Sequence, residues 1–170
     1  VRAGKVRAIG ASNFTAERLR SALEISARDG LARYVALQPH YNLVERPVYE
    51  DGLRDVVADR GLGCLPYFAL AKGFLTGKYR AGEQVDSPRA EGASAYVGER
   101  GDRVLTALQQ VADGHGVTVA AVALRWLADR PTVVSPIASS RSVEQLADLL
   151  PMQDLVLTAE ETQALDAASA

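Results

Sequence analysis

The chain has 170 residues, 48% of them hydrophobic and 24% charged, which is the composition of one globular domain with an apolar core. Its 19 basic and 21 acidic residues give a formal net charge of −2 and are mixed along the sequence, without the basic stripe that a nucleic-acid-binding surface needs. The only cysteine, Cys64, excludes an internal disulfide, and no apolar run approaches the length of a membrane span. We therefore expect a cytoplasmic protein, without metal because its two histidines and its cysteine lack zinc-site spacing.

The first predicted elements are a strand over 6–11 and a helix over 15–28. The strand is a short apolar run, and the helix places its leucines and several alanines on one face. Gly30 is predicted to end this helix. The sequence VRAG before the strand is typical of the last turn of a helix with Gly4 after it, so we expect the chain to be a fragment of a longer polypeptide or a processed product.

The second and third strands are predicted over 34–38 and 62–67, with one helix over 47–60 between them. Pro47 suits the first turn of that helix because its missing N–H has no intrahelical partner there. Gly61 is predicted to end it.

Residues 76–101 follow the third strand and form the one stretch of low hydrophobicity, so a long mobile loop is predicted there. Helices over 100–113 and 118–129 come next, and a fourth strand is predicted over 132–137. Two further helices are predicted to begin with capping boxes, SVEQ at 142–145 and TAEE at 158–161.

This alternation of strands and helices predicts a parallel sheet with helical crossovers. A doubly wound dinucleotide-binding fold would need G-x-G-x-x-G after its first strand, whereas IGASNFTAE contains one glycine. In a (β/α)8 TIM barrel, site residues follow the carboxyl ends of the strands. Polar residues follow all four predicted strands here, in ASN, QPHYN, PYFALAKG and ASSR. We therefore expect an α/β fold that supplies half of such a barrel, four βα units.

Four longer segments carry a resemblance to a known family: GKVRAIGASNF, LQPHYNLVERP, LPYFALAKGFLTGKY and SPIASSRSVEQLADLL. In this order and at these separations they resemble the strand-end motifs of the aldo-keto reductases, over essentially all of residues 1–170. The match is to strands five to eight, the C-terminal half of that family's barrel. The resemblance implies an oxidoreductase that transfers hydride between NADP(H) and a small aldehyde or ketone.

The resemblance also implies cofactor contacts at particular residues. Ser12, Asn13 and Gln38 would hold the nicotinamide carboxamide, whose donor and acceptor suit amide side chains. The nicotinamide ring would stack on Tyr67. The pyrophosphate would be bound by the loop residues Phe68, Ala69, Leu70, Lys72 and Gly73. The adenosine and its phosphate would be bound by Ile137, Ser139, Arg141 and Gln145.

Arg141 would bind a 2′-phosphate, since a guanidinium suits bidentate phosphate binding, and NADP is therefore the expected cofactor. Taken alone, however, Ser142 and Gln145 would be only a helix cap and Arg141 only a solvated charge. The sequence departs from the family in places, with Ser139 where glycine is frequent and Phe68-Ala69 in place of Ser-Pro. Leu149 stands where the family often has an asparagine, so a hydrogen bond to adenine worth about 1 kcal/mol is expected to be missing.

The family's catalytic tyrosine, aspartate, lysine and histidine come from the first half of its barrel, and no matching pattern occurs here. His40 and Tyr41 follow a predicted strand without such companions, so no catalytic residue is predicted. Four strands cannot close a barrel, and the chain is expected to need the missing half-barrel or a second copy. The alternatives are a non-catalytic nucleotide-binding or interaction module and an inactive fragment.

Overall fold

Three parallel strands form the regular sheet of the computed structural model, which describes residues 1–79 and 90–170. They are β1 (Ile9–Ser12), β2 (Tyr34–Gln38) and β3 (Gly63–Cys64), in the order β1-β2-β3. β1 aligns Ser12 with Gln38 of β2, so the two strands end side by side. The predicted parallel α/β arrangement is confirmed for these three strands.

The third strand is shorter than predicted because Pro66 has no N–H to donate to a ladder. Pairing with the segment after β2 nevertheless continues irregularly. The Leu65 N–H donates to the Leu37 carbonyl at 2.9 Å, and the Tyr67 N–H donates to the Pro39 carbonyl at 3.0 Å. The chain therefore stays extended as far as Tyr67.

The prediction of a fourth regular strand over 132–137 is wrong. This segment runs beside β3 and makes one isolated bridge, between Cys64 and Val133. Thr132 lies in the left-handed region at φ 72°, which interrupts an extended strand, and Pro136 cannot donate a ladder hydrogen bond. The Ile137 N–H donates to the Pro66 carbonyl at 2.8 Å, so the segment still ends beside the turn after β3.

Helices follow the strands largely as predicted. α1 (Ala16–Arg28) begins at Thr15, whose hydroxyl accepts from the Arg18 N–H. The single helix predicted over 47–60 is wrong, since the chain forms two short helices, α2 (Pro47–Glu50) and α3 (Leu53–Asp59). Gly52 separates them at φ 84°, a conformation that no helix residue adopts.

Part of the segment predicted as a loop is helical. Within 76–101 the structure contains α4 (Ala90–Ser94) and the first residues of α5 (Glu99–His115), while 80–89 lies outside the described residues. A 3-10 segment, η1 (Ala71–Thr76), precedes it. The later elements are α6 (Val119–Ala128), α7 (Val143–Leu149), η2 (Leu150–Gln153) and α8 (Ala159–Ser169).

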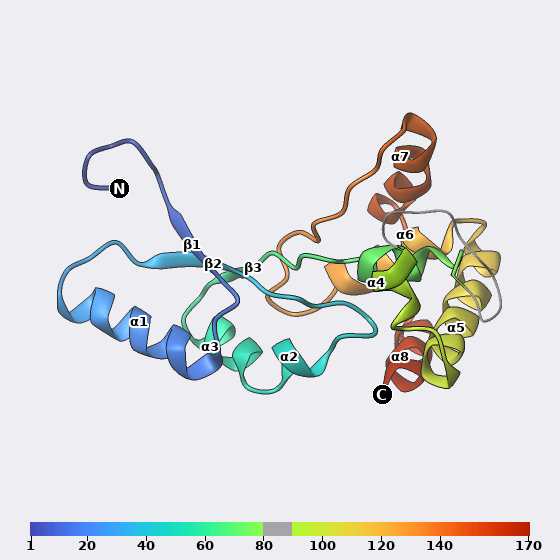
Figure 1. Cartoon of the computed structure of the whole chain (residues 1–170), viewed down its shortest axis with the longest axis horizontal. Helices are drawn as coiled ribbons and strands as arrows, with labels where there is room; N and C mark the ends of the chain where they lie inside the picture. Colours follow the sequence, from blue (N-terminus) through green and yellow to red (C-terminus); the bar gives the residue numbers. More distant parts are fainter. Residues whose placement is uncertain (80–89) are drawn as a thin grey trace.

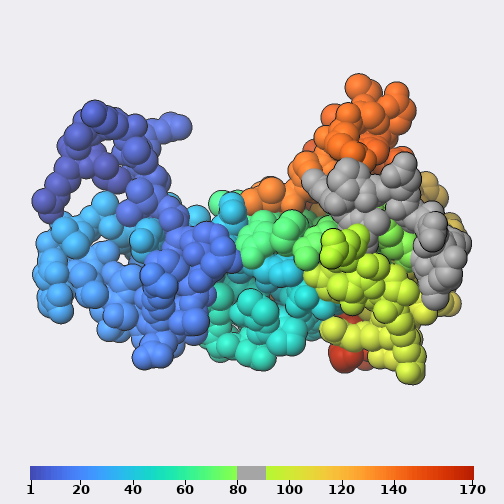
Figure 2. Space-filling view, viewed as in Figure 1, coloured from blue at the N-terminus to red at the C-terminus, as the bar shows by residue number. Residues whose placement is uncertain are grey.

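The core surrounds α6, which is apolar except for Arg125 and is buried over most of its surface. Trp126 and Leu127 are fully buried there. In Figure 1, α1, α3 and α2 lie along one side of the sheet. Val35 and Val134, on the strand segments, remain 47% and 67% exposed, so apolar groups of the sheet region face solvent. Figure 2 shows the orange residues of α7 projecting from the main body, and α7 contains no buried residue.

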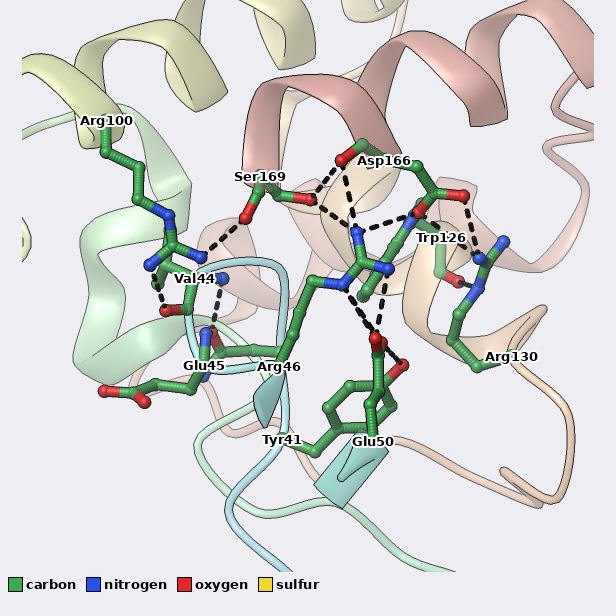
Figure 3. A network of polar contacts seen from close by, with 11 residues as sticks. Tyr41, Val44, Glu45, Arg46, Glu50, Arg100, Trp126, Arg130, Asp166 and Ser169 are labelled. Carbon is green, nitrogen blue, oxygen red and sulfur yellow. Dashed lines mark hydrogen bonds and ion pairs between the residues drawn. The ribbon is translucent and has the colours of Figure 1, made fainter. Parts of the chain in front are cut away.

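A polar network joins the C-terminal helix to the segment after β2 (Figure 3). Arg46 donates to Glu50 Oε1 at 3.0 Å and to Asp166 Oδ1 at 3.2 Å. The buried Trp126 indole N–H donates to the same Asp166 oxygen at 3.0 Å, and Arg130 forms an ion pair with Asp166 at 3.3 Å. Asp166 thus holds α6, α8 and the entry to α2 together.

Candidate functional site

A cavity of about 610 Å³ lies between the turn after β3 and the segment that leads into α7. Ten of the thirteen residues predicted to bind the cofactor line it. They are Tyr67, Phe68, Ala69, Leu70, Lys72, Gly73, Ile137, Ser139, Arg141 and Gln145. Residues far apart in the sequence therefore form one site, although their role toward a cofactor stays a prediction.

The first wall is a turn with unusual backbone geometry. Phe68 and Lys72 have φ values of 52° and 57°, which side-chain-bearing residues seldom adopt, and Gly73 has φ 99°. Such geometry persists where surrounding contacts impose it and is frequent at functional sites.

The contact that holds this turn comes from Asn42, a fully buried polar residue. Its Nδ2 donates to the Phe68 carbonyl at 2.9 Å, and its Oδ1 accepts from the Val44 N–H at 2.9 Å. Sequence reasoning did not single out Asn42. The available signal was a polar residue within the otherwise apolar run YNLV.

The second wall precedes α7. Ser142 caps this helix by accepting from the Gln145 N–H at 3.3 Å. The reciprocal half of the predicted capping box is wrong, because Gln145 Oε1 accepts from the Arg141 N–H at 3.0 Å instead of that of Ser142. Gln145 thereby fixes the backbone of Arg141. By contrast, Thr158 and Glu161 form the complete capping box that was predicted.

The charge of the cavity is predominantly positive. Lys72, Lys78 and Arg141 line it, against one carboxylate, Asp148. Within residues 1–79 and 90–170, none of the three cations forms an ion pair with another residue. The two lysines contact aromatic rings, with Lys72 Nζ 5.5 Å from the centroid of Phe68. Unpaired cations in a concave site attract anions.

Ser12, Asn13 and Gln38 do not line this cavity but lie at the adjacent strand ends. The Tyr67 hydroxyl donates to Asn13 Oδ1 at 2.8 Å. Asn13 Nδ2 donates to Ser12 Oγ at 3.2 Å, and Ser12 Oγ donates to the Gln38 carbonyl at 3.0 Å. A chain of hydrogen bonds thus connects Tyr67, at the edge of the cavity, to all three residues.

The cavity also includes polar residues that were not predicted as ligand contacts: Thr76, Lys78, Tyr79, Thr118 and Asp148. Thr118 caps α6 by accepting from the Ala121 N–H at 3.1 Å and donates to the Asp148 carbonyl at 2.5 Å. It therefore fixes α7 against α6. The signal for Lys78 in the sequence is its place six residues after Lys72, beyond the same strand.

Two other side chains with reactive groups, Tyr41 and Cys64, are buried parts of the fold. The buried Tyr41 hydroxyl donates to Glu50 Oε1 at 2.7 Å, and burial together with this carboxylate raises the pKa of Tyr41 far above its usual value. Burial also raises the pKa of the Cys64 thiol to about 11, so it stays protonated at neutral pH. Neither group is suited to proton transfer or nucleophilic attack there.

The described residues contain no cluster of three or more His, Cys, Asp or Glu side chains that could hold a metal ion. No helix within residues 1–79 and 90–170 combines the length and apolarity needed to cross a membrane.

These observations define an α/β protein with a cation-lined cavity where parallel extended segments end. The chain belongs to the aldo/keto reductase family, whose sequence profile matches residues 1–170. The family expected from the four strand-end motifs is therefore confirmed.

Individual relatives give the same result. The chain is 30% identical to L-glyceraldehyde 3-phosphate reductase of Escherichia coli (strain K12) over 174 residues, which cover 98% of this chain and 50% of that protein. It is 34% identical to Protein tas of the same organism over 148 residues, 85% of this chain and 42% of Protein tas. A probable voltage-gated potassium channel subunit beta of Oryza sativa subsp. japonica is 29% identical over 166 residues, 93% of this chain and 51% of that protein. The chain thus spans about half the length of the curated relatives it matches.

Proposed function

We propose that this chain is the NADP(H)-binding part of a cytoplasmic aldo-keto reductase that interconverts a small aldehyde or ketone and its alcohol. It would supply the C-terminal half of a (β/α)8 barrel, the part that holds strands five to eight in the family. The observation that carries the proposal is the cavity, in which ten predicted cofactor residues meet around three cations that form no ion pair within residues 1–79 and 90–170. A dinucleotide with three phosphates is the kind of ligand such a cavity suits.

The residues present fit NADP(H) in three places. Arg141 has its backbone held by Gln145 and its guanidinium without an ion-pair partner among the described residues, as a 2′-phosphate site requires. Lys72 and Lys78 would bind the pyrophosphate from the turn after β3. Tyr67 would present its ring to the nicotinamide, beside Asn13.

When bound, the nicotinamide supplies the hydride, and the residues of this chain bind and orient the cofactor. Tyr41 cannot donate a proton to a substrate because its hydroxyl is buried and bonded to Glu50. The proton donor and its supporting groups would therefore come from a partner, either the missing half-barrel or a second copy of this chain.

The test is titration of the full chain with NADPH and NADH, with and without Arg141→Ala. Loss of a charge-assisted contact of about 1.5–3 kcal/mol should weaken NADPH about 10-fold to 100-fold. NADH, which lacks the 2′-phosphate, should bind nearly as before. Arg103→Ala, at an exposed ion pair with Glu99, is the matched control and should change neither affinity. Equal weakening of both ligands would contradict the 2′-phosphate assignment.

The second candidate is a non-catalytic nucleotide-binding module, which the similarity to a probable potassium channel subunit beta favours. A carbonyl-reduction assay on the same samples distinguishes the two. NADPH binding without turnover, even in the presence of a first-half barrel, would favour the module. Turnover by residues 1–170 alone would contradict the proposal that the proton donor lies in a partner.

A further inference from the structure

His40 follows β2 and lies against the aromatic residues at the edge of the cavity. Its imidazole stacks on the ring of Tyr67, with ring centroids 5.4 Å apart and planes inclined by only 22°. The edge of the Phe68 ring packs against it at 5.3 Å. The backbones of His40 and Tyr67 also form a parallel bridge, so both ends of the stack are fixed by main-chain pairing.

The stacking partner of His40 is the residue on which the nicotinamide side of the site depends. Tyr67 is half-buried, and its hydroxyl donates to Asn13 Oδ1, which leads on to Ser12 and Gln38. A tyrosine ring that tilted away from this position would break the hydrogen bond to Asn13. The imidazole prevents that tilt from one side of the ring.

Among the described residues, the aromatic contacts of His40 lie at the Tyr67 end of the cavity. Phe68 and Tyr67 are its ring partners, and Asn42 Nδ2 lies 3.5 Å from its Nε2. His40 is not among the residues that line the cavity near Arg141. Any effect of His40 on a ligand should therefore reach the half that contacts Tyr67.

Several groups act on the charge of the imidazole. Burial lowers the pKa of His40, and the positive charge of Lys72 lowers it further, while the carboxylate of Glu45 opposes both. The neutral ring, which prevails at neutral pH, stacks on a phenol through its face and needs no proton for that contact.

We propose that His40 is a positioning residue of this site, whose imidazole backs Tyr67 and fixes the ring and the Asn13 side chain that receive the nicotinamide half of the cofactor. This proposal rests on the proposed function, since it assigns a ligand half to that cavity. His40 does not touch the ligand itself and acts through Tyr67.

The experiment compares two ligands in the full chain: NADPH, and adenosine 2′,5′-bisphosphate, which lacks the nicotinamide half. His40→Ala should weaken NADPH about threefold to tenfold, the size of a lost aromatic pair, and leave the bisphosphate unchanged. His40→Phe keeps a flat ring and should restore NADPH binding. His115→Ala, which changes the other histidine at the end of α5, is the matched control and should affect neither ligand.

Each other outcome overturns the proposal. Unchanged NADPH binding in His40→Ala would show that Tyr67 is held without the imidazole. Equal weakening of both ligands, or no rescue by His40→Phe, would show a general structural role. If the unsubstituted chain bound the bisphosphate but not NADPH, the nicotinamide side would be wrong and the role of His40 with it. If it bound neither ligand, the proposed function itself would fail.

Discussion

Two groups of three cations differ sharply in this molecule. Arg46, Arg100 and Arg130 lie where α8 meets the rest of the chain, and each donates to carboxylates or carbonyls there. Lys72, Lys78 and Arg141 line the cavity and have no ion-pair partner among the described residues. The first group is paired with acceptors of the folded chain itself. The second group lines a cavity with a single carboxylate among its described residues and can therefore attract a bound anion.

The backbone shows the same contrast. The helices around α8 have ordinary conformations and a complete capping box at Thr158. The turn beside the cavity places Phe68 and Lys72 in the left-handed region, at a cost of order 1 kcal/mol or more each. At this turn, strained backbone thus lies beside cations that have no ion-pair partner within residues 1–79 and 90–170, and ligand binding can offset both.

The largest effect on stability is expected from a variant that removes Asp166, the acceptor at the centre of the paired arginines. Asp166→Ala leaves the buried Trp126 indole N–H and two arginines without their shared acceptor. Allowing for the partial exposure of the carboxylate, we expect a loss of about 2 kcal/mol in the free energy of unfolding. Denaturant titration of the variant and the unsubstituted chain measures it.

Asp129→Ala is the matched control for Asp166→Ala, because it removes a more local pair with Arg125 on the surface of α6. It should cost at most about 0.5 kcal/mol. Well below the unfolding transition, NADPH affinity should be the same in both variants. A large loss of affinity in Asp166→Ala would show that the two groups of cations are coupled.

The next largest effect, on NADPH affinity, is expected from removal of one cation of the cavity. Lys78→Ala should weaken NADPH about tenfold, or about 1.4 kcal/mol, since a charge-assisted phosphate contact is lost. The free energy of unfolding should stay unchanged, because Lys78 has no carboxylate partner within residues 1–79 and 90–170. Lys5, the one lysine of the sequence outside the cavity, gives the control Lys5→Ala. A loss of stability without a loss of NADPH affinity would show that Lys78 supports the fold and not the ligand.

The smallest effect concerns Leu149, which is half-buried in the cavity wall. Leu149→Asn offers the amide that is frequent in the family and should tighten NADPH by about 1 kcal/mol, or about fivefold. It should lower stability by a similar amount, because an apolar side chain leaves the core edge. Calorimetric titration and thermal unfolding measure the two changes. Unchanged NADPH affinity would show that the adenine does not lie beside residue 149.

Several helix starts were predictable from the sequence because their signals are local. Thr15, Thr118 and Thr158 each cap the helix expected to follow them. The irregular backbone of residues 132–137 was not predictable, because an apolar β-branched run does not reveal the left-handed φ of Thr132. Tertiary contact, here with Tyr49, holds that residue.

The candidate site shows the same division. Its residues could be predicted because motifs at successive strand ends have to meet at one edge of the structure. Asn42 was missed because its role depends on Phe68, 26 positions later in the chain. The stack of His40 on Tyr67 is likewise a relation between two strand ends, which neither segment reveals alone.

The contact between Arg46 and Asp166 joins residues 120 positions apart. During synthesis, Arg46 and Glu50 leave the ribosome long before the carboxylate that completes their network. Contacts of such large sequence separation form late and slow folding, because a long loop has to close first. The growing chain therefore carries Arg46 and Glu50 without the carboxylate of Asp166 until α8 has been made, and that interval is when chaperone protection would matter most.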